Sequence, residues 1–303
     1  MKTVLVIAGP TASGKSRLAL DLAISRRGTV INADSMQVYR ELQILTARPG
    51  AVEMERAPHR LYGILSATEH CSAARWRALA LAAIEEAHGE GRLPILVGGT
   101  GLYLKALFEG LAEIPPIPSA VRDAARTRHQ ALDGEAFRAE LARRDPESAA
   151  RLAAGDTQRL IRAWEVVEAT GRSLGDWQRA GSAQTTGYDY KTILVMPPRE
   201  ALYAACDARF DAMLAAGALD EVRALMALGL DPALPAVKSL GVPELARHLA
   251  GEWSLEQAAE KGRQATRNYA KRQTTWFRHQ LAPDLVLEGP DSAAAEGLLP
   301  PDC

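Results

Sequence analysis

Residues 9–16, GPTASGKS, constrain the fold of this chain more than any other stretch. They follow the apolar run TVLVIA and precede the helical pattern RLALDLAISRR, so they match a phosphate-binding loop, G-x-x-x-x-G-K-[ST], between a strand and a helix. Gly9 and Gly14 permit a tight turn whose backbone N–H groups converge on anionic oxygens. Lys15 adds a positive charge, and the hydroxyl of Ser16 is the usual Mg²⁺ ligand of such a loop. We expect a phosphate site at the first strand-to-helix turn.

Apolar runs rich in valine and isoleucine predict the strands of a sheet. They occupy residues 3–8, 29–32, 94–98 and 191–196, with 285–288 as a further candidate. Helical patterns lie between most of them, notably at 15–27 and 72–90. Near-continuous apolar strands that alternate with helices are typical of a parallel sheet covered on both faces. The sequence therefore predicts a doubly wound α/β core with the phosphate-binding loop at its first turn.

A proline-rich segment at 112–119 interrupts this pattern. Between residues 120 and 179 only helical segments follow, the clearest being DTQRLIRAWEVVEATG, with Asp156 as an expected N-cap and Gly171 as a stop. A loop-like stretch precedes the next strand. We expect a helical insertion at 120–184 within an α/β core formed by 1–119 and 185–303.

Residues 254–280 predict a long helix that opens with a capping-box pattern. Its part from 261 to 280 contains six lysines and arginines and no acidic residue, interleaved with Tyr269, Trp276 and Phe277. A solvated basic face with its aromatic residues in the core accounts for this pattern. Binding to a nucleic-acid backbone accounts for it equally well.

Composition restricts the class of protein. The 303 residues carry a net charge of −1, so nucleic-acid binding must rely on local basic patches. The three cysteines lie far apart, without the spacing of a metal site or a disulfide framework, which favours a reducing cytoplasm. No apolar stretch reaches the roughly 18 residues that span a bilayer. The short apolar run at the N-terminus predicts a buried strand rather than a signal peptide. We expect a soluble, cytoplasmic protein with no membrane partner, and nothing requires more than a monomer.

The partners of a nucleotide-hydrolysing loop are missing from the sequence. A Walker-B aspartate normally ends an apolar strand and holds Mg²⁺, yet the strand at 94–98 continues into GTGLYLKAL without a carboxylate. The chain also lacks the N-K-x-D motif of a GTPase. The loop is therefore expected to bind phosphate without the usual hydrolytic residues.

Two polar residues follow predicted strands. Asp34, in INADSMQVYR, stands at the carboxyl end of the second strand, where α/β sheets place their ligands. A carboxylate there can orient Mg²⁺ or accept a proton, and a turn or helix-cap role is the alternative. Thr100, in VGGTGLY, lies in a glycine-rich turn after the third strand, and an ordinary tight turn explains it equally well.

Taken in order, seven motifs resemble those of the bacterial tRNA dimethylallyltransferase family, also called tRNA isopentenyltransferases. They are GPTASGKS, NADSMQVYR, TARP, VGGTGLYLKALFEG, DTQRLIRAWEV, RFDAMLAAGALDEV and ATRNYAKRQTTWFR, and they extend from residue 9 to residue 278. The resemblance implies a P-loop nucleotide-kinase-like core with an RNA-contacting helical insertion. It also implies transfer of a dimethylallyl group from dimethylallyl diphosphate to N6 of the adenosine on the 3′ side of the anticodon in tRNA, with Mg²⁺ as cofactor.

The resemblance further implies roles for individual residues. Asp34 is the expected general base, and Thr100 lies near the reaction centre. For the donor diphosphate the implied residues are Gly9, Thr11, Ala12, Ser13, Gly14, Lys15, Ser16 and Arg209, with Ser16 also the metal ligand. For tRNA they are Asp34, Ser35, Met36, Gln37, Thr100, Arg122, Gln158, Arg159, Leu160, Ile161, Arg162, Lys271, Arg272 and Gln273.

Departures from the family pattern are few. Arg48 in TARP replaces the usual lysine and keeps the charge, whereas Val242 replaces a usual tyrosine and puts a tRNA contact at that position in doubt. No Cys/His zinc extension is present, which favours the bacterial form over the eukaryotic one.

Two other functions remain as alternatives. An isopentenyltransferase that modifies free adenine nucleotides would share the loop and Asp34 but would not need an RNA-binding insertion. A nucleotide-dependent RNA-binding switch would hold ATP or GTP in the loop without group transfer, although it would be expected to carry the missing hydrolytic motifs.

Overall fold

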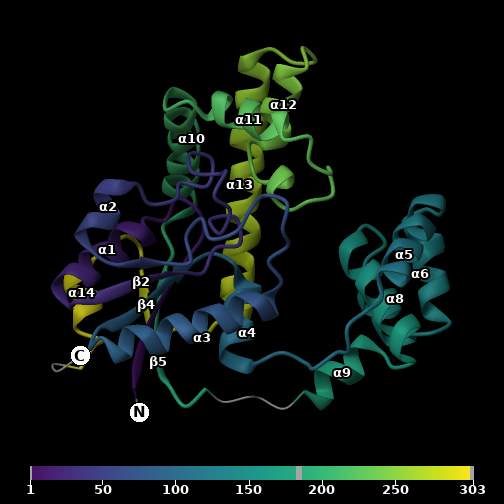
Figure 1. Cartoon of the computed structure of the whole chain (residues 1–303), viewed down its shortest axis with the longest axis horizontal. Coiled ribbons are helices and arrows are strands. Elements are labelled where there is room, and N and C mark those ends of the chain that lie inside the picture. Colours follow the sequence, from purple (N-terminus) through teal and green to yellow (C-terminus); the bar gives the residue numbers. More distant parts are fainter. Residues whose placement is uncertain (1, 182–185, 301–303) are drawn as a thin grey trace. The chain divides into compact units, whose positions relative to one another are not determined.

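The computed structural model describes residues 2–181 and 186–300, and the chain divides into two compact units (Figure 1). The core unit consists of Met1–Leu107 and Thr186–Cys303, and the helical unit of Phe108–Thr185. The helical unit begins ahead of the expected position 120. Ala112 lies against Gly181, so the proline-rich segment is part of the helical unit.

The core unit contains every strand found in the described residues. Its first segment comprises β1 (Thr3–Ala8), α1 (Lys15–Ser25), β2 (Gly28–Asn32), α2 (Ala51–Arg56), β3 (His59–Arg60), α3 (Ala73–Gly89), β4 (Leu93–Gly98) and most of α4 (Gly101–Glu109). Its second segment comprises β5 (Asp189–Val195), α10 (Arg199–Ala215), α11 (Ala218–Ala227), η1 (Ala236–Lys238), α12 (Val242–Leu249), α13 (Leu255–Gln280), β6 (Leu285–Leu287) and α14 (Ser292–Glu296).

Six parallel strands form one sheet in the order β3-β2-β4-β1-β5-β6. All five predicted strands are present, which confirms the α/β fold. The two-residue strand β3 was not anticipated, because so short a segment carries no periodic signal. β1 lies in the middle of the sheet and is buried along nearly its whole length, as its continuous apolar sequence requires.

Helices cover both faces of the sheet. Leu5 and Ile7 of β1 join a core cluster with α1 and α14 on one face, and alternation along the strand directs Val4 and Val6 to the other. The crossovers from β1 to β2 through α1 and from β3 to β4 through α3 run in opposite directions. Right-handed connections therefore place α1 and α3 on opposite faces.

The strand order reverses between β4 and β1. The chain leaves β1 toward β2 on one side and leaves β4 toward β5 on the other. The crevice outside the carboxyl ends of the strands at such a point is the usual ligand site of an α/β sheet. The phosphate-binding loop and Thr100 follow these two strands directly, and Asp34 follows the neighbouring β2.

The helix α13 is the longest element of the core unit and packs against α10 and α12 (Figure 1). Its predicted capping box is confirmed, since the Ser254 hydroxyl accepts a hydrogen bond from Gln257 N and the Gln257 side chain accepts one from Ser254 N. Leu42 and Leu45 pack with α11 and α12 in a second apolar cluster. Within the described residues, no helix combines the length and the apolar character needed to cross a membrane.

The helical unit contains no strand in its described residues, as predicted. It comprises α5 (Ser119–Ala131), α6 (Gly134–Ala142), α7 (Pro146–Arg151), α8 (Thr157–Thr170) and α9 (Leu174–Ala180), around a core that includes Phe137 and Trp164. Gly171 ends α8 in the left-handed conformation, as expected. The predicted N-cap position of Asp156 is confirmed, although its carboxylate makes no capping hydrogen bond and lies 3.4 Å from Arg159.

Candidate active site

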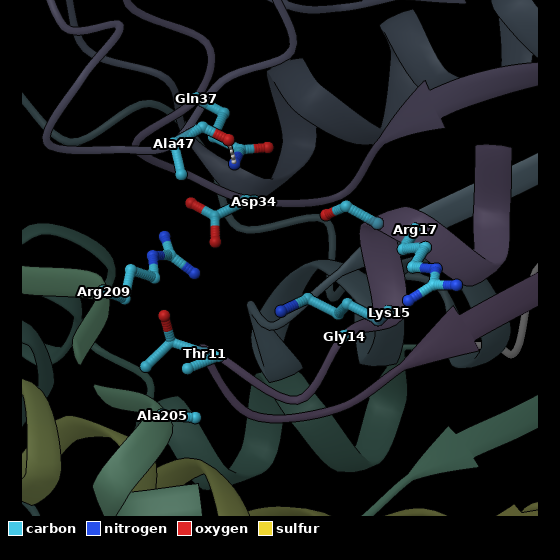
Figure 2. A pocket seen from close by; sticks show the side chains of 11 residues that line it. Thr11, Gly14, Lys15, Arg17, Asp34, Gln37, Ala47, Ala205 and Arg209 are labelled. Atoms are coloured by element: carbon cyan, nitrogen blue, oxygen red, sulfur yellow. Dashed lines mark hydrogen bonds between the residues drawn. The ribbon is translucent and has the colours of Figure 1, made fainter. Parts of the chain in front are cut away.

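A pocket of about 340 Å³ lies at the carboxyl edge of the sheet, inside the core unit (Figure 2). The phosphate-binding loop, the turn after β2, the loop at 43–48 and α10 all contribute to its wall. The lining residues are Thr11, Ala12, Gly14, Lys15, Ser16, Arg17, Asp34, Gln37, Ala47, Ala205 and Arg209. The pocket thus brings together sequence motifs that lie nearly 200 residues apart.

The phosphate-binding loop has the geometry expected from its sequence. Gly14 stands at the N-cap of α1 with φ 89°, a left-handed conformation that residues with a Cβ rarely adopt. Lys15 then begins the helix, is 9% exposed, and donates a hydrogen bond from Nζ to the Pro10 carbonyl at 3.1 Å. The positive end of α1 therefore faces the pocket together with the lysine ammonium.

Two cations face the pocket from opposite elements. Burial lowers the pKa of Lys15 to about 8, an effect that Asp34 opposes and that Arg209 strengthens. Burial likewise lowers the pKa of Arg209, again opposed by Asp34. Arg209 donates from Nη2 to the Thr46 carbonyl at 3.4 Å. Two positive charges beside one carboxylate leave the pocket with an excess of positive charge, which favours a polyanionic ligand.

Asn32 positions Asp34 from the end of β2. Its side chain is fully buried; Oδ1 accepts a hydrogen bond from Asp34 N at 2.8 Å, and Nδ2 donates to the Asp34 carbonyl at 2.9 Å and to the Leu61 carbonyl at 3.1 Å. Asn32 was not among the site residues predicted from the sequence. A buried amide at the strand end, two residues before the carboxylate, was the signal that could have revealed it.

Only one oxygen of the Asp34 carboxylate accepts a hydrogen bond from the turn that carries it. Oδ1 accepts a hydrogen bond from Met36 N at 2.9 Å, the Asx-turn bond expected of a turn aspartate. Figure 2 shows the carboxylate pointing toward the Arg209 guanidinium across the pocket. The turn role and the pocket role are therefore compatible, because one oxygen anchors the side chain while the group still lines the cavity.

Thr100 connects the two predicted site turns. Its Oγ1 accepts a hydrogen bond from Ser35 N at 2.9 Å and donates one to Ser35 Oγ at 3.3 Å. Burial raises the pKa of the Tyr269 hydroxyl on α13, an effect that the charge of Asp34 strengthens and that Thr100 opposes. Tyr269 was predicted only as part of an aromatic pattern, yet its hydroxyl interacts electrostatically with both predicted site residues.

Gln273 joins the phosphate-binding loop to the glycine-rich turn after β4. Its Oε1 accepts a hydrogen bond from Thr11 N at 2.8 Å, and its Nε2 donates to the Gly99 carbonyl at 2.9 Å. The residue is 5% exposed. The structure therefore gives Gln273 a place inside the protein, different from the surface position that an RNA contact requires.

The other residues predicted to contact RNA divide by exposure. Lys271 and Arg272 are exposed on α13, and Arg272 lies over the Tyr269 ring at 5.6 Å. Leu160 is fully buried in the core of the helical unit, so its side chain is not available to RNA. Exposed or partly exposed in the helical unit are Arg122, Gln158, Arg159, Ile161 and Arg162. Val242, where a contact was in doubt, is buried in the second apolar cluster.

The oxygen donors around the pocket suit Mg²⁺. The Ser16 hydroxyl and the Asp34 carboxylate line the cavity, and both are hard ligands of the kind that Mg²⁺ prefers. Across residues 2–181 and 186–300, no cluster of three or more His, Cys, Asp or Glu residues is suited to hold a metal. A metal here would take most of its ligands from substrate phosphates and water, as is usual for Mg²⁺.

Comparison with known proteins identifies relatives of this chain. The model of the IPP transferase family matches residues 37–280. The tRNA dimethylallyltransferase of Rhodospirillum centenum is 62% identical over 282 residues, which cover 93% of this chain and 90% of that protein. The enzyme of the same name from Nitrobacter hamburgensis is 59% identical over 293 residues, which cover 96% of this chain and 92% of that protein.

Solved structures with the same fold extend the comparison. The full-length tRNA isopentenylpyrophosphate transferase of Bacillus halodurans has a TM-score of 0.70 at 32% identity and covers 98% of this chain and 93% of its own. A eukaryotic dimethylallyltransferase, described in snapshots of its action on tRNA, has a TM-score of 0.82 at 28% identity, covering 98% of this chain and 78% of its own.

The lowered pKa of Lys15 predicts a pH dependence of anion binding. Since the pKa is about 8, the ammonium is charged below that pH and becomes neutral above it, and a bound anion draws the proton back. Affinity for inorganic diphosphate should fall by about tenfold once Lys15 is neutral. Calorimetric titration between pH 7 and 10 should also detect proton uptake on binding.

Lys15→Arg is the reference for this titration, because arginine stays protonated over the whole range. In the Lys15→Arg variant, the affinity for diphosphate changes with pH only through the ionisation of diphosphate itself and not through that of residue 15. Identical profiles for the two proteins would contradict the assignment of the titration to Lys15.

Gln273→Met should loosen the phosphate-binding loop. Methionine has a similar size but leaves Thr11 N and the Gly99 carbonyl without partners, at a cost of about 1–3 kcal/mol in the free energy of unfolding. Weaker binding of inorganic diphosphate should accompany a lower unfolding midpoint. The matched control is Gln280→Met, an exposed glutamine at the end of the same helix, and equal behaviour of the two variants would rule out the bridging role.

Proposed function

The chain belongs to the IPP transferase family of tRNA dimethylallyltransferases, and we propose that the pocket at residues 11–17 and Asp34 is the site of its reaction. The enzyme is a prenyltransferase that transfers a dimethylallyl group to N6 of the adenosine on the 3′ side of the anticodon in tRNA. The products are N6-isopentenyladenosine and diphosphate.

The chemistry sets two requirements for the site. The N6 amine of adenine is a weak nucleophile because its lone pair is delocalised into the ring, so a base must accept its proton as the C–N bond forms. The bond from C1 of the dimethylallyl group to oxygen breaks at the same time, and the diphosphate leaves with its negative charge. A suitable site therefore holds cations beside a single proton acceptor.

The observation that carries the proposal is the meeting of Lys15, Arg209 and Asp34 in one pocket (Figure 2). Lys15, Arg209 and the N–H groups at the start of α1 supply the positive charge that stabilises a departing diphosphate. The Asp34 carboxylate, fixed by Asn32 and Met36 N, supplies the proton acceptor. Thr100 bonds the turn that carries Asp34 and lies next to the reacting amine in this assignment.

The assignment extends to the donor and to the metal. Dimethylallyl diphosphate places its phosphates on the loop residues Gly9, Thr11, Ala12, Ser13, Gly14, Lys15 and Ser16 and on Arg209. Ser16 would hold Mg²⁺, which supplies further stabilisation of negative charge on the diphosphate. We propose a monomer as the active form and the cytoplasm, where the tRNA substrate resides, as the place of the reaction.

RNA recognition is assigned to two surfaces. A base stacked in an anticodon loop cannot reach a pocket, so the target adenosine is flipped out of its stack toward residues 34–37 and Thr100. Lys271 and Arg272 on α13 neutralise backbone phosphates, because both are exposed and belong to a stretch without acidic residues. From the helical unit Arg122, Arg159 and Arg162 do the same, and the neutral Gln158 side chain contributes a hydrogen bond to the RNA.

One incubation tests the reaction against its alternatives. The protein with Mg²⁺ and dimethylallyl diphosphate should convert adenosine to N6-isopentenyladenosine in an anticodon stem-loop and not in free AMP, as detected by mass spectrometry. Equal modification of AMP would favour an enzyme acting on free nucleotides, and ATP hydrolysis without transfer would favour a switch.

Asp34→Asn tests the proton acceptor. The variant keeps the acceptor for Met36 N but removes the base, so kcat should fall by about 10²–10⁴-fold with unchanged affinity for RNA. Normal turnover of the variant would remove Asp34 from the mechanism.

Lys271→Ala combined with Arg272→Ala should weaken tRNA binding and flatten its dependence on salt. Loss of two phosphate contacts should reduce the slope of log K against log [salt] by about 1.4–1.8. Arg223→Ala, which removes an exposed charge on α11, serves as the control. An unchanged slope in the double variant would show that Lys271 and Arg272 form an ordinary solvated surface that does not contact RNA phosphates.

A further inference from the structure

Glu221 of α11 binds three successive backbone N–H groups of a loop that lies far away in the sequence. Its Oε2 accepts hydrogen bonds from Gln43 N at 2.7 Å and Ile44 N at 2.8 Å, and its Oε1 accepts one from Leu45 N at 2.9 Å. Hydrogen bonds to an ionised acceptor are the strong ones, and three of them converge here on a single carboxylate. Neither the phosphate-binding motif nor the basic helix accounts for this arrangement.

The loop that Glu221 holds leads directly into the pocket wall. Two residues after Ile44, the Thr46 carbonyl accepts a hydrogen bond from Gln37 Nε2 at 2.8 Å and one from Arg209 Nη2 at 3.4 Å. The Ala47 carbonyl accepts a further bond from Gln37 Nε2 at 3.1 Å (Figure 2). Ala47 and Gln37 both line the pocket.

The loop relies on its anchor because its own conformation is strained. Ala47 has φ 49°, in the left-handed region that residues with a Cβ rarely adopt. Such a conformation persists only where the surroundings fix it. Inside the loop, Ala47 N donates a hydrogen bond to the Ile44 carbonyl and Arg48 N donates one to the Gln43 carbonyl. Glu221 therefore binds the N–H groups of the same two residues whose carbonyls close the turn.

The anchor and the pocket arginine belong to consecutive helices. Arg209 lies on α10 and Glu221 on α11, which begins three residues after α10 ends. The two helices therefore set the position of the Arg209 guanidinium and of the carbonyl that it bonds. A shift of the loop relative to α10 would break the bond from Nη2 to the Thr46 carbonyl and leave the guanidinium free to rotate.

We propose that Glu221 is a positioning residue for donor binding, which acts through residues 43–47 to orient Arg209 toward the diphosphate. The inference rests on the proposed assignment of Arg209 to the donor diphosphate. Glu221 does not line the pocket, so its effect on the donor must pass through the loop.

Glu221→Ala tests this role by kinetics. It should raise KM for dimethylallyl diphosphate by about tenfold, the equivalent of one lost charge-assisted hydrogen bond, with KM for the anticodon stem-loop close to that of the unaltered protein. Glu221→Gln keeps an oxygen acceptor for two N–H groups but opposes its own N–H₂ to Leu45 N. The KM of Glu221→Gln for the donor should therefore lie between that of the unaltered protein and that of Glu221→Ala. This variant provides the measurement if the alanine variant does not fold.

Asp220→Ala is the matched control. Asp220 is the neighbouring residue on α11, its side chain is 79% exposed, and its salt bridge is to Arg223 of the same helix. The control should leave both KM values unchanged. Comparison of unfolding midpoints separates the two roles, because a plain loop anchor would lower the midpoint of the Glu221 variants without a selective change in KM for the donor.

Arg209→Ala, alone and combined with Glu221→Ala, completes the design. If Glu221 acts through Arg209, the double variant should be little worse for donor KM than Arg209→Ala alone. A normal donor KM in Glu221→Ala beside an impaired Arg209→Ala would overturn the positioning role, as would full additivity of the two changes. A normal donor KM in Arg209→Ala would overturn the diphosphate assignment itself, and the inference with it.

Discussion

Burial of the Lys15 ammonium is the constraint on which the site depends. A charge removed from water is costly unless it is compensated, and here the compensation from within the protein is one carbonyl hydrogen bond and a carboxylate across the pocket. The pKa of Lys15 is lowered because these two interactions do not fully compensate for the burial of its positive charge. The positive charge of Arg209 lowers the pKa further. In the proposed assignment the donor diphosphate supplies the missing negative charge. The pocket is therefore complementary to a polyanion before any ligand arrives, and under that assignment the charge that develops on the leaving group meets groups that are already in position.

Three polar side chains hold the loops that surround this charge. Asn32 fixes the turn of Asp34, Gln273 bridges the phosphate-binding loop and the Gly99 carbonyl, and Glu221 gathers the N–H groups of residues 43–45. Each of them satisfies backbone groups that loops would otherwise leave unpaired. Since each anchor comes from a regular element, the pocket wall inherits the rigidity of the sheet and of the helices packed on it. Positioning of catalytic groups by such supports is what transfer to a weak nucleophile requires.

The sequence was sufficient for the parts of this design that depend on local pattern. Continuous apolar runs identified the strands, and the position of Asp34 and Thr100 directly after two of them placed both at the carboxyl edge of the sheet. The supports could not be foreseen because their partners are distant: Gln273 lies 262 residues from Thr11, and Glu221 lies 178 residues from Gln43. Neither glutamine nor glutamate on a helix carries a signal that distinguishes a surface position from a bridge. Gln273 was accordingly predicted with its exposed neighbours Lys271 and Arg272, and the pattern that located Asp156 at the N-cap could not show that its carboxylate lies beside Arg159 instead of making a capping bond.

The end of β4 distinguishes this phosphate-binding loop from that of a nucleotide hydrolase. A hydrolase places a carboxylate there to hold Mg²⁺ beside a nucleotide. In this chain the strand ends at Gly98, where an added Cβ would lie 2.1 Å from the Ala33 carbonyl, so no side chain fits. The space belongs instead to the backbone of the turn that carries Asp34, and Thr100 N bonds the same Ala33 carbonyl. The carboxylate at this edge of the sheet is instead that of Asp34, in the turn after β2, where it lines the pocket and in the proposed mechanism accepts a proton from the amine.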